Sequence, residues 1–199
     1  VKAIQQKAAK YHAEGYLIVL VGNASHPEIK GINGWCDGKA IVTDGMSPVT
    51  LPACEKALVM FQTTFDTRFF EKSLQNICSD HVKTLEIFNT ICYTTTVRQN
   101  YARMLSAKCD LCIVVGDKNS SNTKRLFDVA SANTRAVWSD GTLGKIDLTE
   151  TRNVCIISGA STPTELIKGV FERMIEETKD TAVETAVSDE TVEIAPEAV

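Results

Sequence analysis

An internal repeat with an offset of about 95 residues limits the folds that this chain can adopt. Segment 39–45 (KAIVTDG) aligns with 135–141 (RAVWSDG), and segment 16–22 (YLIVLVG) aligns with 110–116 (DLCIVVG). The second pair consists of apolar runs that each end in a glycine followed by a polar loop. Self-similarity at a fixed spacing indicates a repeated supersecondary unit. We therefore expect two similar modules in succession.

Apolar runs alternate with amphipathic segments along both modules. Unbroken Val, Ile and Leu runs between helices predict parallel sheets that are covered on both faces. The predicted fold class is α/β, as tandem three-layer modules with mainly parallel sheets at 1–84 and 85–176, followed by an acidic, disordered tail or linker at 177–199. The expected helices are 2–14, 66–77, 95–107, 122–132 and 163–177, and the expected strands are 16–21, 39–43, 57–61, 111–115, 135–138 and 153–158.

Charge and composition exclude several classes of partner. The chain has 21 Lys and Arg against 25 Asp and Glu, and its formal net charge of -4 argues against a nucleic-acid partner. Most of the acidic excess lies in 176–199, so residues 1–175 carry a small positive excess that favours anionic small molecules. The longest apolar runs are strand-sized, far below the roughly 20 residues that span a bilayer. The seven cysteines, an odd number, favour a reducing, cytoplasmic compartment.

The pair Cys109 and Cys112 has the spacing of a zinc half-site or of a redox motif. A zinc site requires a second pair of ligands at similar spacing, and the three histidines do not provide one. Cys112 also lies inside the apolar run 111–115. We therefore expect these two side chains to fill the core at a helix-to-strand junction.

Five polar loops follow an expected strand or precede an expected helix. Ligands of parallel α/β sheets bind outside the carboxyl ends of the strands, and the N–H groups at helix N-termini bind phosphate well. One such loop, 118–122, has four consecutive donor-bearing side chains after Lys118, whereas a helix cap needs one. We interpret it as an anion site, with helix capping as the alternative. The loops are 23–28, 62–64, 92–96, 118–122 and 159–163.

Three side chains in these loops are suited to chemistry. His26 and Glu28 flank a proline after a buried strand, where a histidine can donate to an anion and a carboxylate can pass a proton. The alternative is that both are solvated loop side chains. Cys92 opens another polar loop, where its thiol can be a nucleophile, a metal ligand or a group without a role.

Together, these loops resemble the motifs of the 4-hydroxy-3-methylbut-2-enyl diphosphate reductase family, which acts last in the non-mevalonate isoprenoid pathway. The resemblance covers about residues 1–176 and is most specific at 92–99 (CYTTTVRQ) and 116–122 (GDKNSSN). It implies a trefoil of three modules around a [4Fe-4S] cluster held by three cysteines. It also implies reductive removal of the substrate's hydroxyl to leave isopentenyl and dimethylallyl diphosphates, with an external electron donor such as ferredoxin or flavodoxin.

The resemblance implies roles for eight residues of this sequence. Cys92 matches a cluster ligand, and Glu28 and Thr63 match the residues that deliver protons. The residues that match diphosphate ligands are His26, Ser120, Ser121, Asn122 and Ser161. The family's N-terminal module has no counterpart, so we expect the chain to be the second and third modules of a reductase, inactive alone. The alternatives are a non-catalytic diphosphate-binding module without a cluster, and an unrelated sugar-phosphate enzyme.

Overall fold

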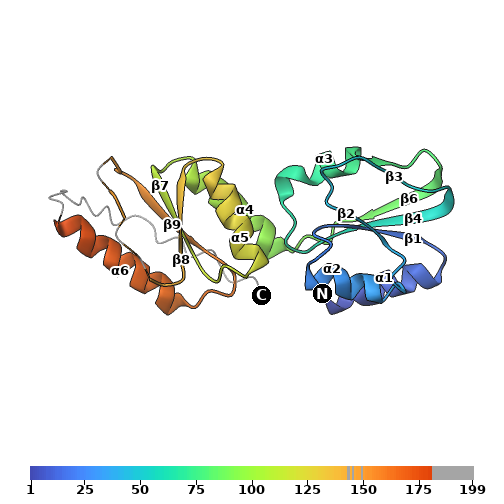
Figure 1. The fold of residues 1–199 in the computed structure, drawn as a ribbon, viewed down its shortest axis with the longest axis horizontal. Helices are drawn as coiled ribbons and strands as arrows, with labels where there is room; N and C mark the ends of the chain where they lie inside the picture. The colour runs from blue at the N-terminus through green and yellow to red at the C-terminus, as the bar shows by residue number, and fades with distance from the viewer. Residues whose placement is uncertain (143, 145, 149, 181–199) are drawn as a thin grey trace. The chain divides into compact units, whose positions relative to one another are not determined.

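The computed structural model describes residues 1–180 except 143, 145 and 149. The chain forms two compact units, Val1–Thr96 and Val97–Val199 (Figure 1). The helices are α1 (Lys2–Ala13), α2 (Pro27–Gly34), the 3-10 helix η1 (Thr67–Phe69), α3 (Phe70–Gln75), α4 (Tyr93–Ser106), α5 (Ser121–Ser131) and α6 (Thr164–Asp180). The strands are β1 (Leu17–Val21), β2 (Ile41–Thr43), β3 (Val49–Thr50), β4 (Cys54–Phe61), β5 (Ile77–Cys78), β6 (Val82–Phe88), β7 (Leu111–Val115), β8 (Arg135–Ser139) and β9 (Val154–Ser158).

The first unit is a three-layer structure around a sheet in the order β2-β1-β4-β6 (Figure 1). All three strand pairs of this sheet are parallel. Helices α1 and α2 cover one face, where Ala8, Ile29 and Ile32 pack against apolar side chains of β1 and β4. The other face is covered by α3 and by a small sheet of β3 and β5. Strands β1 and β4 are therefore buried on both sides, which explains their unbroken apolar sequences.

The second unit repeats this plan with a sheet in the order β8-β7-β9, again with parallel pairs. Side chains of α4 and α5 pack on one face of β7, and Val170 and Met174 of α6 pack on the other. All five residues of β7 are buried. The predicted α/β class with parallel sheets is confirmed in both units.

The internal repeat extends to individual hydrogen bonds. The glycine after each central strand donates its N–H to the end of the next strand, from Gly22 to Thr43 and from Gly116 to Ser139, both at 2.8 Å. The last carbonyl of each central strand accepts a bond from the residue that follows the neighbouring strand on the other side, which is β4 in the first unit and β9 in the second. The Val21 carbonyl accepts from the Gln62 N–H at 2.8 Å, and the Val115 carbonyl accepts from the Gly159 N–H at 3.1 Å. The repeat therefore places equivalent loops at equivalent strand ends.

Four elements of the first unit were absent from the sequence prediction: α2, β6 and the two short strands β3 and β5. Residues 27–34 form α2 instead of continuing the polar loop. Residues 82–88 form β6, so the predicted boundary after residue 84 lies inside a strand that pairs with β4, and the structure divides the chain after Thr96. Strand β6 is an edge strand in which polar residues interrupt the apolar ones. It therefore has no unbroken apolar run of the kind that predicted the other strands.

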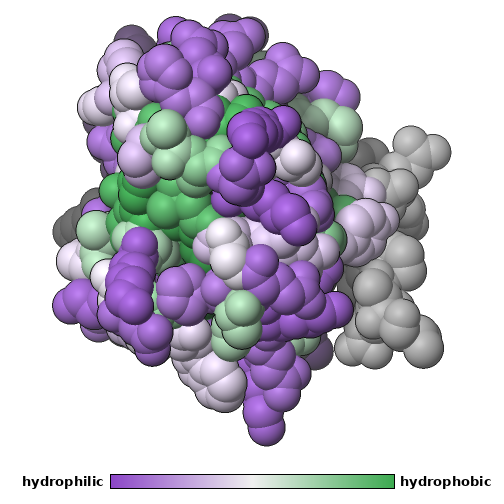
Figure 2. Space-filling view, turned by 90° about the vertical axis from the view of Figure 1, so that its right-hand side faces the viewer, coloured by the Kyte–Doolittle hydropathy of each residue, from purple (hydrophilic) through white to green (hydrophobic). Residues whose placement is uncertain are grey.

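The surface of the first unit has an apolar area inside a hydrophilic border (Figure 2). Ile87 of the edge strand β6 is 46% exposed, and Trp35 after α2 is 50% exposed.

Helix α6 includes residues 177–180 of the predicted tail, and the rest of that tail lies outside the described residues. Among the helices that the structure describes, none has the length and apolar character to span a bilayer.

Candidate active site

Glu28 and Thr63 form a hydrogen-bonded pair at the carboxyl ends of β1 and β4. Glu28 lies in the first turn of α2 and is 8% exposed. Its Oε1 accepts from the backbone N–H of Thr63 at 2.8 Å, and its Oε2 accepts from the Thr63 hydroxyl at 2.6 Å. These two bonds and the dipole of α2 stabilise a buried carboxylate. The carboxylate therefore has a direct path for proton exchange with the Thr63 hydroxyl.

His26 caps the N-terminus of α2. Its Nδ1 accepts from the backbone N–H of Glu28 at 3.2 Å, and Pro27 occupies the first turn of the helix, where its missing N–H is not needed. A ring nitrogen that accepts a hydrogen bond carries no proton, so this bond places the proton of a neutral His26 on Nε2. The Nε2–H group is then the part of His26 that can donate to an anion.

Gln62 connects the two loops that hold this pair. It is 5% exposed, its Oε1 accepts from the backbone N–H of Asn23 at 3.0 Å, and its Nε2 donates to the Thr64 hydroxyl at 2.9 Å. A Cβ on Gly22 would lie 2.7 Å from the Gln62 Cβ, so a glycine is required where these loops meet. The sequence alone places Gln62 in a polar loop and gives no sign of this connecting role.

Cys92 lies beside the same loops. Its backbone N–H donates to the carbonyl of Thr63 at 2.9 Å, and the residue immediately precedes α4. Partial burial raises the pKa of the Cys92 thiol, but hydrogen bonds from the backbone and side chains of Thr95 and Thr94 outweigh it, so the pKa is lower than usual. An exposed thiol at a helix N-terminus with a lowered pKa is suited to ligate a metal or to react as a nucleophile.

The polar loop of the second unit begins α5, and part of its polarity serves as a helix cap. The Ser120 hydroxyl accepts from the backbone N–H of Thr123 at 3.4 Å and caps the helix. Both amide atoms of Asn122 are buried, and they have no hydrogen-bond partner among the described residues. Buried polar groups without partners are costly, so Asn122 is suited to bind a ligand.

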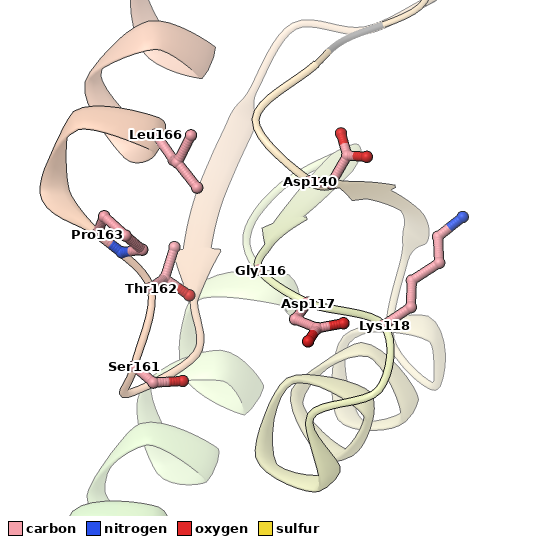
Figure 3. Close-up of a pocket in the computed structure, with 8 residues that line it drawn as sticks. All are labelled: Gly116, Asp117, Lys118, Asp140, Ser161, Thr162, Pro163 and Leu166. Carbon is pink, nitrogen blue, oxygen red and sulfur yellow. The ribbon is translucent and has the colours of Figure 1, made fainter.

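Ser161 lines a cavity of about 420 Å³ at the carboxyl ends of the second unit's strands. Figure 3 shows the hydroxyls of Ser161 and Thr162 on the side of their loop that faces Gly116 and Asp117. The Thr162 hydroxyl already uses its hydrogen, because it donates to the carbonyl of Val115 at 3.1 Å. The cavity is lined by Gly116, Asp117, Lys118, Asp140, Ser161, Thr162, Pro163 and Leu166. Of the predicted anion ligands, it includes Ser161 but not Ser120, Ser121 or Asn122.

The charges around this cavity are mixed. Asp140 accepts hydrogen bonds from the hydroxyl and the backbone of Thr142, and these bonds, with Lys118 nearby, lower the pKa of Asp140. Lys118 is the basic group of the cavity lining. A second basic residue, Arg98 of α4, donates from Nη1 to the carbonyl of Ser158 at 3.0 Å, at the end of β9. Arg98 belongs to the motif 92–99, although no role for it was predicted from the sequence.

The structure therefore brings the predicted residues together in two groups. His26, Glu28, Thr63 and Cys92 are connected through α2 and the loop after β4 in the first unit. Ser120, Ser121 and Asn122 begin α5 in the second unit, where Ser161 follows β9. Within the described part of the chain, no group of three His, Cys, Asp or Glu side chains is arranged to hold a metal ion. The described residues therefore do not form a complete site for a cluster that needs three cysteines.

The fold and these loops define an α/β protein of tandem parallel modules, with a hydrogen-bonded pair of a buried carboxylate and a hydroxyl at the strand ends and a low-pKa thiol at the start of α4. Residues 1–175 match the family model described as LytB protein, so the chain belongs to the LytB family. This confirms the resemblance found in the sequence.

The curated relatives of the chain are reductases by name. The 4-hydroxy-3-methylbut-2-enyl diphosphate reductase of Clostridium acetobutylicum is 37% identical over 182 residues, covering 88% of this chain and 28% of that protein. The enzyme of the same name from Caldanaerobacter subterraneus is 36% identical over 178 residues, covering 87% of this chain and 62% of that protein. The chain thus spans less than two thirds of the length of either relative.

Two solved structures are similar in fold. The E-1-hydroxy-2-methyl-but-2-enyl-4-diphosphate reductase of Plasmodium falciparum matches 86% of this chain and 56% of its own, with a TM-score of 0.75 and 26% identity. A structure described as (E)-4-hydroxy-3-methyl-but-2-enyl diphosphate reductase, the terminal enzyme of the non-mevalonate pathway, matches 88% of this chain and 64% of its own, with a TM-score of 0.51 and 31% identity.

Proposed function

We propose that this chain supplies proton-delivering and diphosphate-binding residues for the reductive dehydroxylation of 4-hydroxy-3-methylbut-2-enyl diphosphate to isopentenyl and dimethylallyl diphosphates. The observation that carries this proposal is the bonded pair of Glu28 and Thr63 beside the low-pKa thiol of Cys92. A structural role would not require a buried carboxylate and a hydroxyl to bond at a loop junction that also holds the backbone of Cys92. Membership of a family whose relatives are named as this reductase supports the same reaction.

Glu28 and Thr63 act as a proton relay in this proposal. The 2.6 Å bond between Glu28 Oε2 and Thr63 Oγ1 lets the protonated carboxyl donate to the hydroxyl oxygen while the hydroxyl passes its own proton to the departing group. The second bond, from the Thr63 N–H to Oε1, holds the carboxyl in place during this exchange. Loss of a substrate hydroxyl as water requires such a proton.

Neutral donors hold the diphosphate in this proposal. His26 donates from Nε2, the nitrogen that its capping bond leaves protonated. Ser121, Asn122 and Ser161 donate from the second unit, and Asn122 is the strongest candidate because its buried amide has no described partner. Ser120 is proposed as a further donor, although its oxygen also caps α5. Donors at a helix N-terminus suit phosphate oxygens.

Cys92 fits one ligand position of an iron–sulfur cluster, since its thiol is exposed and its pKa is lowered. An iron–sulfur cluster, when bound, supplies electrons and an electrophilic iron for removing a hydroxyl group. No group of three such ligands exists in the part of the chain that the structure describes. We therefore propose that two further cysteines come from sequence that the longer relatives have, and that this chain is inactive alone.

A non-catalytic diphosphate-binding module is the second candidate function. The observation that favours it is the buried Asn122 amide at the start of α5, which has no described partner and can bind a phosphate oxygen without a cluster. Both functions predict that the chain binds pyrophosphate, and only the first predicts turnover once the missing ligands are supplied.

The test is anaerobic turnover of the allylic diphosphate with a reduced dye after iron–sulfur reconstitution. The chain is assayed alone and joined to the additional sequence of its curated relatives. We expect turnover only in the joined form, with a loss of about 100-fold or more in Glu28→Gln because general acid catalysis contributes about that much. The matched control is Glu71→Gln, an exposed carboxylate of α3. Normal turnover in Glu28→Gln would remove Glu28 from the mechanism.

Iron content gives an independent measurement. Cys92→Ser in the joined form should lower the iron content, whereas Cys78→Ser should leave it unchanged because Cys78, also exposed, lies outside the site. A fully loaded cluster in Cys92→Ser would refute the ligand role. If the joined form binds pyrophosphate but shows no turnover, the second candidate function is correct.

A further inference from the structure

Three free thiols gather in the second unit, away from the loops described above. Cys109 lies between α4 and β7, and Cys112 and Cys155 are the second residues of β7 and β9. All three belong to one apolar cluster. The Sγ atoms of Cys109 and Cys155 are 3.0 Å apart, although the residues are 46 positions apart in the sequence. The predicted role of Cys112 as a core residue is confirmed by its full burial, but that role does not explain the close approach of the other two thiols.

The backbone positions of the three thiols favour a disulfide between Cys109 and Cys155 over one between Cys112 and Cys155. Cys112 and Cys155 are directly opposite in neighbouring parallel strands, and Cys112 is 0% exposed. Its backbone is fixed by strand pairing on both sides, because β7 is the central strand. Cys109 is partly exposed and lies outside the strands, where its backbone has more freedom to adjust. Moving the two sulfurs from 3.0 Å to a bond length of about 2.05 Å needs a shift of only about 1 Å.

We propose that Cys109 and Cys155 are an oxidative modification site that forms an intramolecular disulfide with a peroxide as the oxidant. Cys109, the more accessible thiol, loses two electrons to hydrogen peroxide and becomes a sulfenic acid, with release of one water. The Cys155 sulfur then attacks the Cys109 sulfur, the S–O bond breaks, the S–S bond forms, and the sulfenic oxygen leaves as a second water. Two thiols and one peroxide thus yield one disulfide and two waters.

The local environment makes this site slow to react and its disulfide hard to reduce. Burial and the contact with Cys155 raise the pKa of Cys109 to about 12, and the contact with Cys112 and burial raise the pKa of Cys155. Protonated thiols are poor nucleophiles, so oxidation needs sustained exposure. Thiols with a high pKa are also poor leaving groups, so the disulfide resists thiol exchange once it forms.

The disulfide would close a covalent loop that contains α5 and β8. Cross-linking a loop of this length constrains the unfolded chain strongly. We expect the midpoint of thermal unfolding of the second unit to rise by roughly 10 °C or more in the oxidised protein.

The test uses the full chain with Cys78→Ser and Cys92→Ser, which removes the two exposed thiols and leaves five of the seven. The folded protein is incubated with hydrogen peroxide for hours, unfolded in the presence of N-ethylmaleimide, digested and analysed by mass spectrometry. We expect the thiol number to fall from five to three, with a peptide pair joined through Cys109 and Cys155.

Single substitutions in this background make the proposal specific. Cys112→Ser should keep the crosslink, whereas Cys109→Ser and Cys155→Ser should each abolish it; circular dichroism confirms that each variant is folded. The same treatment in urea measures random pairing. Five intact thiols in the folded protein would overturn the proposal, as would pairing through Cys112 or the same mixture of pairs in folded and unfolded protein.

Discussion

Replacing Thr63 by valine tests whether the bond to Glu28 stabilises the first unit. Valine keeps the shape of threonine but removes the hydroxyl that donates to Oε2 at 2.6 Å, while the backbone bond to Oε1 at 2.8 Å remains. Glu28 is 8% exposed, so water replaces the lost donor poorly. A hydrogen bond to a charged group contributes about 1.5–3 kcal/mol. We therefore expect the free energy of unfolding of the first unit to fall by about 2 kcal/mol.

The chain allows this unit to be measured separately. It has two tryptophans, Trp35 in the first unit and Trp138 in the second, so in a Trp138→Phe background the fluorescence of Trp35 reports urea unfolding of the first unit. The control is Thr63→Ser, which keeps the hydroxyl and should cost clearly less than Thr63→Val. If the two variants have the same free energy of unfolding within about 0.5 kcal/mol, the hydroxyl does not stabilise the carboxylate and the relay geometry is wrong.

Three further predictions concern individual residues. Cys92 should react with iodoacetamide at pH 7 faster than Cys78, which is also exposed, because its lowered pKa leaves more thiolate; equal rates measured by mass spectrometry would contradict this. Backbone hydrogen bonds lower the pKa of Asp110 below 3.8, so its stabilising contribution is present above that value and lost as the pH falls below it; Asp110→Asn should reduce the loss of stability on acidification below pH 3.8, measured by urea unfolding at several pH values. Gly159→Ala should lower the free energy of unfolding of the second unit by about 1–3 kcal/mol, because the new Cβ would overlap the Thr123 hydroxyl, and adding Thr123→Ala should recover much of the loss.

The apolar pattern predicted the sheets well, because buried parallel strands leave an unbroken run in the sequence. Helix α2 was missed because it has only eight residues and contains Gly31 and Gly34, which lower helix propensity. Strand β6 was missed because Lys83 and Thr84 interrupt its apolar residues, as an edge strand permits. The sequence pattern therefore detected the central strands and the edge strands β2, β8 and β9, and it missed the edge strand whose apolar run is interrupted.

The sequence predicted which residues belong to the site, but it did not predict which of their side chains contact one another. The loops after β1 and β4 were recognised as polar, and the family resemblance gave Glu28 and Thr63 one shared role, but no pattern in the residues themselves indicated a bond between two side chains that are 35 positions apart. The contact between Cys109 and Cys155 was not predicted either. The sequence spacing suggested a pair of Cys109 and Cys112, whereas the fold brings the thiol of Cys155 into contact with that of Cys109. Contacts across strand ends depend on sheet order, which the sequence pattern left open.

The parallel pairing of every strand in the two main sheets has a consequence for how this chain folds. No two of these strands can be joined by a tight hairpin. The first pair of strands in each unit can therefore form only after the long connecting segment between them has brought the two strands together. Even the nearest pairs are far apart in sequence: in the first unit Val19 pairs with Ile41, 22 residues later, and in the second Leu111 pairs with Arg135, 24 residues later. Chains dominated by such distant contacts fold slowly, and their apolar strands stay exposed in the meantime. Newly made chains of this protein should therefore depend on dilution or on chaperones more than a helical bundle of the same length.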